Sequence, residues 1–152
     1  MDPVESYSDM SVVTHGQILS DYTLGYAWIE ANLIKTGFNT RKTTKKGVRR
    51  MRVSLSKEGF MPSNAVVVIP ADITRFGSDM FMMDQKDLEE GVKFQCVDGM
   101  HRTRCVQELA AEKAEGLPGS ESIFCGDEVY AIILRPDTPR NYLIQLSLSK
   151  ST

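Results

Sequence analysis

The sequence predicts one domain of the α+β class, in which a small mixed sheet is flanked by helices. Short apolar runs rich in β-branched residues alternate along the chain with longer segments whose apolar residues recur at helical spacing, a pattern typical of mixed α/β folds. The chain has 152 residues, 41% of them hydrophobic, which is enough for one substantial core. We find no internal repeat and no low-complexity segment, so the pattern favours neither a solenoid nor a disordered chain.

Four segments are expected to form strands, at residues 26–33, 65–70, 93–98 and 128–134. The first alternates between apolar and polar residues, and the second, AVVVIP, is a β-branched run that ends at a proline. The third and fourth are short apolar runs followed by turn-forming residues. The order of these segments predicts a sheet with both parallel and antiparallel neighbours.

Three segments are expected to form helices, at residues 44–59, 101–115 and 138–150. Gly59 and Gly116 are placed to end the first two, because glycine adopts the left-handed conformation that commonly closes a helix. The residues expected on the inner faces are Val48, Met51 and Leu55, then Cys105, Val106, Leu109 and Ala110, and last Tyr142, Leu143 and Leu146.

Two segments lie outside this pattern. Residues 1–25 are polar and weakly patterned, so we expect an N-terminal arm that precedes a domain spanning residues 26–152. Residues 71–90 are acidic and methionine-rich, which is typical of an insertion. The last segment has no obvious closing element after it, and we expect the chain to be a fragment of a longer protein. Trp28 is most simply interpreted as a core residue.

Charge is distributed unevenly along the chain. The formal net charge is -2, which argues against nucleic-acid binding over the whole surface. Residues 31–57, however, hold nine of the 18 basic residues and no acidic residue. A basic surface formed by residues 35–57 therefore suggests an anionic partner.

The sequence also limits the compartment that we expect. No apolar run approaches the ~20 residues of a membrane span, and the acidic N-terminus lacks a signal-peptide pattern. The three cysteines are odd in number and have neither disulfide-framework nor zinc-site spacing. We therefore expect an intracellular protein, cytoplasmic or nuclear, with free thiols and no membrane partner.

The junction between the third strand and the second helix is the best candidate for a ligand site. Potential cations stand in the first turn of this helix, where the helix dipole disfavours positive charge. They are His101, Arg102 and Arg104. We interpret them as groups for an anion, because the N–H groups at a helix N-terminus also bind phosphate. Gly99 lacks a Cβ atom and lets a ligand approach the backbone closely.

Each residue of this junction has a distinct chemical use. Arg102 can bind two phosphate oxygens at once, Arg104 adds positive charge, and Thr103 supplies a hydroxyl. His101 either contacts the ligand or makes a structural hydrogen bond. Asp98 caps the helix, positions one of the cations or takes part in a metal site, and these alternatives stay open. The common glycine-rich nucleotide motifs are absent from the sequence.

The segment VDGMHRTRCVQELAAE, residues 97–112, resembles the phosphate-binding motif of the ParB/sulfiredoxin superfamily, in which a strand leads through Gly-x-His-Arg into a helix. ANLIKTGFNTRK resembles the first strand of this superfamily and its Asn-x-Arg turn, here Asn39 and Arg41. GVRRMRVSLSKEGFMPSNAVVVI resembles the next helix and strand, and EVYAIILRPDTPRNYLIQLSLSKST resembles the last strand and the following helix. The resemblance covers residues 26–152, apart from the acidic segment 71–90.

The resemblance implies a ligand and its contacts. The ligand would be ATP or another nucleoside triphosphate, with Mg²⁺, and the basic helix would help to hold its phosphates. The candidate phosphate-binding residues are Gly99, Met100, His101, Arg102, Thr103, Arg104, Asn39, Arg41, Lys46, Arg50 and Ser54. The candidate catalytic residues are Asp98, His101 and Glu30. Glu30 is included because related kinases carry an acid near the first strand.

A Mg-dependent NTPase or phosphotransferase is the first function that the resemblance suggests. Sulfiredoxin chemistry is not expected, because Met100 stands where sulfiredoxins carry their catalytic cysteine and a thioether cannot replace a thiol. Cys96 and Cys105 are poorly placed to substitute for it. The region that matches the metal-binding helix of ParB proteins contains Gln145 but no carboxylate, so the metal ligands stay unknown.

Three alternatives remain open at this level. The first alternative is a ParB-like DNA-binding or nuclease module that uses the basic surface of residues 35–57. The second is a catalytically degenerate domain that senses nucleotides. A protein partner or a second copy of the chain is also compatible with the sequence. DNA binding through several phosphate contacts differs from nucleotide binding in its steep dependence on salt.

Overall fold

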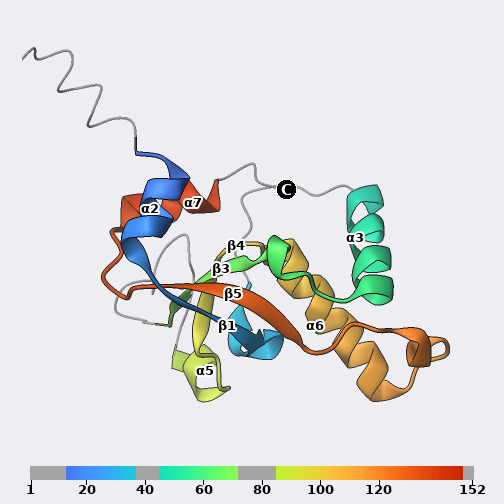
Figure 1. Ribbon diagram of the computed structural model, residues 1–152. Helices are drawn as coiled ribbons and strands as arrows, with labels where there is room; N and C mark the ends of the chain where they lie inside the picture. The colour runs from blue at the N-terminus through green and yellow to red at the C-terminus, as the bar shows by residue number, and fades with distance from the viewer. Residues whose placement is uncertain (1–12, 37–44, 72–84, 149–152) are drawn as a thin grey trace, which may run out of the picture.

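The computed structural model describes residues 13–36, 45–71 and 85–148, which form helices packed around one sheet (Figure 1). The strands are β1 (Thr23–Glu30), β2 (Ile34–Lys35), β3 (Val66–Pro70), β4 (Phe94–Asp98) and β5 (Glu128–Leu134). The helices are α2 (His15–Tyr22), α3 (Lys45–Glu58), α5 (Gln85–Glu89), α6 (Met100–Glu115) and α7 (Arg140–Ser147). Three short 3₁₀ segments are η1 (Ala31–Leu33), η2 (Pro62–Asn64) and η3 (Ser120–Ser122).

The five strands form a mixed sheet in the order β1-β5-β3-β4-β2. The pairs β1/β5 and β3/β4 are antiparallel, whereas β3/β5 and β2/β4 are parallel. Helices cover both faces of this sheet, so the predicted α+β class with a mixed sheet is confirmed. The three predicted helices and four predicted strands are all present, with boundaries shifted by a few residues.

The β-branched run of β3 lies in the middle of the sheet and supplies both cores. Val66 and Val68 face a core formed with α3 and α6, whereas Val67 and Ile69 face a second core formed with α2 and α7. Consecutive residues of a strand point to opposite faces, so a strand that is covered on both sides must be apolar throughout. This explains why AVVVIP shows no polar alternation.

The sheet is curled, as the short link between its two edge strands shows. Strands β1 and β2 are its two opposite edges, yet only η1 separates them along the chain. The four Cα–Cα steps from Glu30 to Ile34 span at most about 15 Å, whereas five flat strands would be about 19 Å wide. Gln107 of α6 fixes this link, because its Nε2 atom donates to the carbonyl oxygens of Ala31 at 2.7 Å and of Ile34 at 3.2 Å.

The expectation of an N-terminal arm over residues 1–25 was wrong for its second half. Residues 15–22 form α2, which begins with a capping box in which Thr14 and Gln17 satisfy each other's backbone N–H groups. Ile18 is fully buried, and β1 begins at Thr23 rather than at residue 26. A helix of eight residues with one deeply buried side chain has too little periodicity to stand out in a sequence.

Of the expected insertion at residues 71–90, the structure describes residue 71 and residues 85–90. Residues 72–84 lie outside the described part of the chain, and residues 85–89 form α5. The Asp87 carboxylate accepts a hydrogen bond from Lys35 Nζ at 2.9 Å and is largely buried. This end of the acidic segment is therefore tied to β2, the short edge strand that the sequence pattern did not indicate. No described helix is long and apolar enough to cross a membrane.

Candidate functional site

The turn between β4 and α6 requires glycine. Gly99 is the N-cap of α6 with φ of 94°, in the left-handed region that residues with a Cβ atom avoid. A Cβ atom here would lie 2.6 Å from Val66 Cγ1, which is closer than carbon atoms approach. Asp98 is the last residue of β4 and lies one position before the N-cap residue. The turn thus leaves the first N–H groups of α6 without an intrahelical acceptor.

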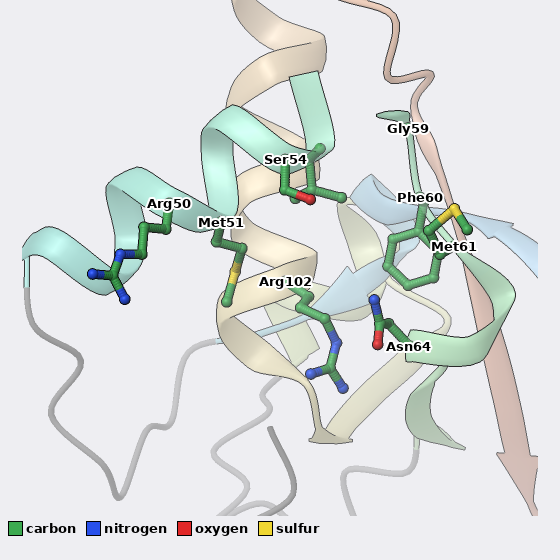
Figure 2. A pocket seen from close by; sticks show the side chains of 9 residues that line it. Arg50, Met51, Ser54, Gly59, Phe60, Met61, Asn64 and Arg102 are labelled. Carbon is green, nitrogen blue, oxygen red and sulfur yellow. The ribbon is translucent and has the colours of Figure 1, made fainter. Parts of the chain in front are cut away.

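Arg102 lies in the first turn of α6, and its side chain extends toward Asn64 of η2 (Figure 2). Its Nη2 atom makes one long contact, 3.4 Å, with the carbonyl oxygen of Ala65. Its Nε atom is buried and makes no hydrogen bond within the described part of the chain. A guanidinium group that is partly desolvated and incompletely hydrogen-bonded is a strong donor for an anion.

A pocket of about 290 Å³ opens beside Arg102. Its walls come from α3, from the turn that follows α3, from η2 and from α6. The lining residues are Arg50, Met51, Ser54, Leu55, Gly59, Phe60, Met61, Asn64 and Arg102. In Figure 2, Arg102 and Asn64 extend toward the same space, whereas the guanidinium of Arg50 points away from it. One wall of the pocket is therefore apolar, and the side next to α6 is polar.

The structure brings together three of the residues predicted to bind phosphate. Arg102 from α6 and Arg50 and Ser54 from α3 line the same pocket, although 48 positions separate Ser54 from Arg102 in the sequence. Gly99 is adjacent to this group, because a Cβ atom added to Gly99 would lie 3.1 Å from Arg102 Nη2. The packing of α3 against α6 makes this meeting possible.

Other predicted residues of the α6 N-terminus lie elsewhere. The Thr103 side chain is fully buried and its hydroxyl donates to the carbonyl oxygen of Gly99 at 3.0 Å. Met100 is a core residue with 8% exposure. Arg104 Nη2 donates to the carbonyl oxygen of Thr36 at 2.9 Å, on the side of α6 that faces β2. These contacts stabilise the fold, and none of the three residues lines the pocket.

The three candidate catalytic residues, Asp98, His101 and Glu30, all lie outside the pocket lining. His101 is half-buried in the first turn of α6. Glu30 is exposed at the end of β1, next to Ala31, whose carbonyl oxygen bonds to Gln107. Gln107 is seven residues into α6, so this contact lies about 10 Å along the helix from its N-terminus. Asn39 and Arg41 lie outside the described residues, and the same is true of the side chain of Lys46.

None of the three cysteines is exposed as a nucleophile. Cys96, Cys105 and Cys125 are all buried and free. Burial, with a smaller effect of the Asp98 charge, raises the pKa of Cys96 to about 12, and burial raises the pKa of Cys105 to about 11. A thiol with such a raised pKa is almost entirely protonated at neutral pH, and the protonated thiol is a poor nucleophile. Neither Cys96 nor Cys105 can therefore stand in for the sulfiredoxin cysteine.

The pocket lining does not fit a magnesium site. Mg²⁺ in proteins is usually held by one or two carboxylates together with substrate phosphates. The oxygen-bearing side chains of the lining are Ser54 and Asn64, and neither is a carboxylate. Among the described residues there is also no group of three or more His, Cys, Asp or Glu side chains that could hold a metal ion.

Part of the basic surface predicted over residues 35–57 is committed to ion pairs. Lys35 forms an ion pair with Asp87. Arg52 forms ion pairs with two acidic residues of α6, and the first places Arg52 Nη1 2.9 Å from Glu108 Oε2. The second partner of Arg52 is Glu112. These pairs raise the pKa of Arg52, chiefly through the Glu112 hydrogen bond, and fasten α3 to α6. Other basic residues of α3 remain exposed. They are Arg49, Arg50 and Lys57.

The sequence pattern missed the contribution of η2 to the site. Phe60, Met61 and Asn64 complete the pocket, and they follow the glycine that ends α3. The signal that was available is the turn-rich segment between a helix and a buried strand, which has to carry the chain from α3 to β3 beside the α6 N-terminus.

A comparison of this chain with protein-family models, curated proteins and solved structures finds no match.

Proposed function

We propose that the chain binds a nucleoside triphosphate, with the phosphates held beside Arg102 and the N-terminus of α6. The observation that carries this proposal is the Arg102 side chain, which reaches a pocket while its buried Nε atom lacks a hydrogen-bond partner among the described residues. Phosphate oxygens would accept from the guanidinium and from the N–H groups of the first turn, where the helix dipole also favours negative charge.

The rest of the lining supports a nucleotide over inorganic phosphate. Met51, Phe60 and Met61 form an apolar wall against which a planar base can pack, and the amide of Asn64 can bond to the edge of a base or to a sugar hydroxyl. The volume of about 290 Å³ is near the lower end of ligand pockets. The ParB/sulfiredoxin resemblance, which rests on the same turn, favours the same ligand.

Our proposal covers binding and includes no hydrolysis or transfer step. Turnover would need a metal ion or a catalytic carboxylate beside the phosphates, and the lining provides no carboxylate. A Mg-dependent NTPase or phosphotransferase therefore stays a prediction from the resemblance. A nucleotide-sensing domain without turnover agrees better with this lining.

Isothermal titration with ATP, CTP, GTP and ADP, with and without Mg²⁺, tests the proposal. We expect micromolar binding of at least one nucleotide, weakened about tenfold or more in Arg102→Ala, because a hydrogen bond to a charged group contributes about 1.5–3 kcal/mol. Arg104→Ala is the matched control, because Arg104 lies on the same helix but bonds to Thr36 outside the pocket. Absence of binding by all four nucleotides would overturn the proposal, and so would equal losses in the two variants.

DNA binding is the second candidate, and the exposed arginines of α3 favour it. Arg49 and Arg50 are adjacent and exposed, so they can contact phosphates of a duplex without entering a pocket. Fluorescence anisotropy with a labelled duplex at 50 and 200 mM NaCl distinguishes this function. DNA binding predicts a loss of affinity of an order of magnitude or more over this range, a loss in Arg49→Ala and no effect of Arg102→Ala.

A further inference from the structure

A second pocket lies where β1 ends and β5 begins, and it shares Gly59 and Phe60 with the Arg102 pocket. Its volume is about 330 Å³. The lining residues are Trp28, Glu58, Gly59, Phe60, Phe124, Gly126, Asp127 and Glu128. Three of these residues are aromatic, three are acidic and none is basic, so the pocket differs in chemistry from the site described above.

Two of the three aromatic residues that line the pocket are exposed, whereas Phe60 is buried. Trp28 packs edge-on to Phe60, with ring centroids 6.1 Å apart and an interplanar angle of 78°. Trp28 is 46% exposed and Phe124 is 72% exposed, so the interpretation of Trp28 as a core residue was wrong. The exposed rings of Trp28 and Phe124 line the same pocket, and the face of an aromatic ring attracts cations.

Backbone contacts hold this pocket in shape. The N–H group of Phe124 donates to the carbonyl oxygen of Ser56 at 2.7 Å, and the carbonyl oxygen of Asp127 accepts from the N–H group of Ala31 at 2.8 Å. A Cβ atom on Gly59 would lie 3.2 Å from Phe124 Cδ1, so the glycine allows the ring to lie against the turn. A pocket with fixed walls loses little entropy when a ligand binds.

The negative charge of the pocket is not compensated within the described part of the chain. Glu58, Asp127 and Glu128 make no ion pair with any described residue. Glu30 adds to this charge, because it lies directly opposite Glu128 in the antiparallel β1/β5 pair. Like charges at directly opposite positions destabilise a sheet, so a cation bound here would relieve repulsion as well as gain attraction.

We propose that this pocket binds the ammonium or guanidinium group of a lysine or arginine side chain of a partner protein. A protein partner fits better than a small cation, because the apolar surface continues from Trp28 along the same face of β1. Tyr26 is 61% exposed and Leu24 is 66% exposed. β1 is an edge strand, and an extended segment can lie along such an edge. The partner segment therefore carries a basic residue flanked by apolar residues.

The fluorescence of Trp28 tests this proposal directly, because Trp28 is the only tryptophan of the chain. The probes are acetylated, amidated peptides of the sequence Gly-Leu-Arg-Leu-Gly, with lysine or the neutral isostere citrulline in the central position. We expect a saturable change in fluorescence with the arginine and lysine peptides, and binding at least about fivefold weaker with citrulline. Equal titration curves for arginine and citrulline would overturn the proposal, as would absence of a change at millimolar peptide.

Variants locate the cation. Glu128→Gln and Asp127→Asn should each weaken binding of the arginine peptide by about threefold to tenfold. Glu89→Gln, an exposed acid of α5 outside the pocket, is the matched control and should leave binding unchanged. Circular dichroism checks that each variant is folded. Unchanged affinity in both folded pocket variants would contradict the proposal. This site does not depend on the nucleotide proposal, and Arg102→Ala should leave peptide binding intact.

Discussion

At the scale of single residues, the α6 N-terminus separates positions that hold the fold from positions available to a ligand. Arg102 and Arg104 are two residues apart, which places them on different sides of a helix. Arg104 bonds to Thr36 and fixes the chain after β2, whereas Arg102 reaches the pocket and makes one long hydrogen bond, to Ala65, among the described residues. Charge alone does not distinguish the two in the sequence, because the difference arises from what lies opposite each side chain.

Gly99→Ala should be one of the most destabilising single changes in this turn. The left-handed conformation costs a residue with a Cβ atom about 1–2 kcal/mol, and forced overlap with Val66 adds about 1–3 kcal/mol. Urea unfolding followed by circular dichroism measures the loss. Gly91→Ala is the matched control, because Gly91 has φ of 96° but an added Cβ would meet nothing within 4 Å. Equal losses in the two variants would show that contact with Val66 is unimportant.

Several site residues were predictable from the sequence and others were not. The strand that ends at Asp-Gly before a helix predicted Gly99 and Arg102, because both follow from local chain geometry. The sequence also placed Thr103 among the ligand groups, but its side chain faces the core and bonds to Gly99. Asn64 was missed because its position depends on how η2 packs, which is a tertiary property without a local signal.

At the scale of elements, α2 shows why the start of the domain was placed too late. Its residues are mostly polar, and only Ile18 is buried on one side of eight residues. The capping box supplies local stability, but the packing of α2 against α7 decides that the segment is helical. The hydrophobic repeat of a sequence indicates long amphipathic helices such as α6, but it is too short to indicate a helix of eight residues.

Ile18→Ala should destabilise the whole domain by about 2–5 kcal/mol, because it removes a fully buried side chain from the core between α2, α7 and the sheet. Urea unfolding again gives the free energy. Ser20→Ala, an exposed change in the same helix, should stay within about 0.5 kcal/mol of the wild type. If Ile18→Ala were as mild as Ser20→Ala, α2 would be an accessory arm after all.

At the scale of the whole molecule, one curled sheet divides the described residues into two cores. The proposed nucleotide pocket and the acidic aromatic pocket both border the core that α3 and α6 cover, and they share Gly59 and Phe60. The mixed sheet was predictable because four of its strands, β1, β3, β4 and β5, are each a short run of strand-forming residues. The curl was not predictable, because it follows from the pairing of β2, which has two residues and no pattern of its own.

The raised thiol pKa values predict slow labelling of the native protein. An ordinary thiol with pKa 9.0 is half ionised at pH 9, whereas Cys96 and Cys105, with pKa values of about 12 and 11, stay protonated there. A disulfide reagent such as DTNB should therefore react slowly with the native protein at both pH 8 and pH 9. Once urea unfolds the chain, the reagent should label all three cysteines rapidly. Fast labelling of the native protein would contradict the buried positions of the thiols.

The most direct test of the central proposal is a ¹H–¹⁵N NMR titration of the protein with ATP. Binding at the α6 N-terminus predicts that the largest shifts occur at the amides of Gly99 and Arg102 and at the Arg102 Nε–H signal. That last signal should move strongly, because its proton would gain an acceptor. The amide of Gly116, at the other end of α6, should not move. Shifts confined to the exposed arginines of α3, or no shifts at millimolar ATP, would contradict the proposal.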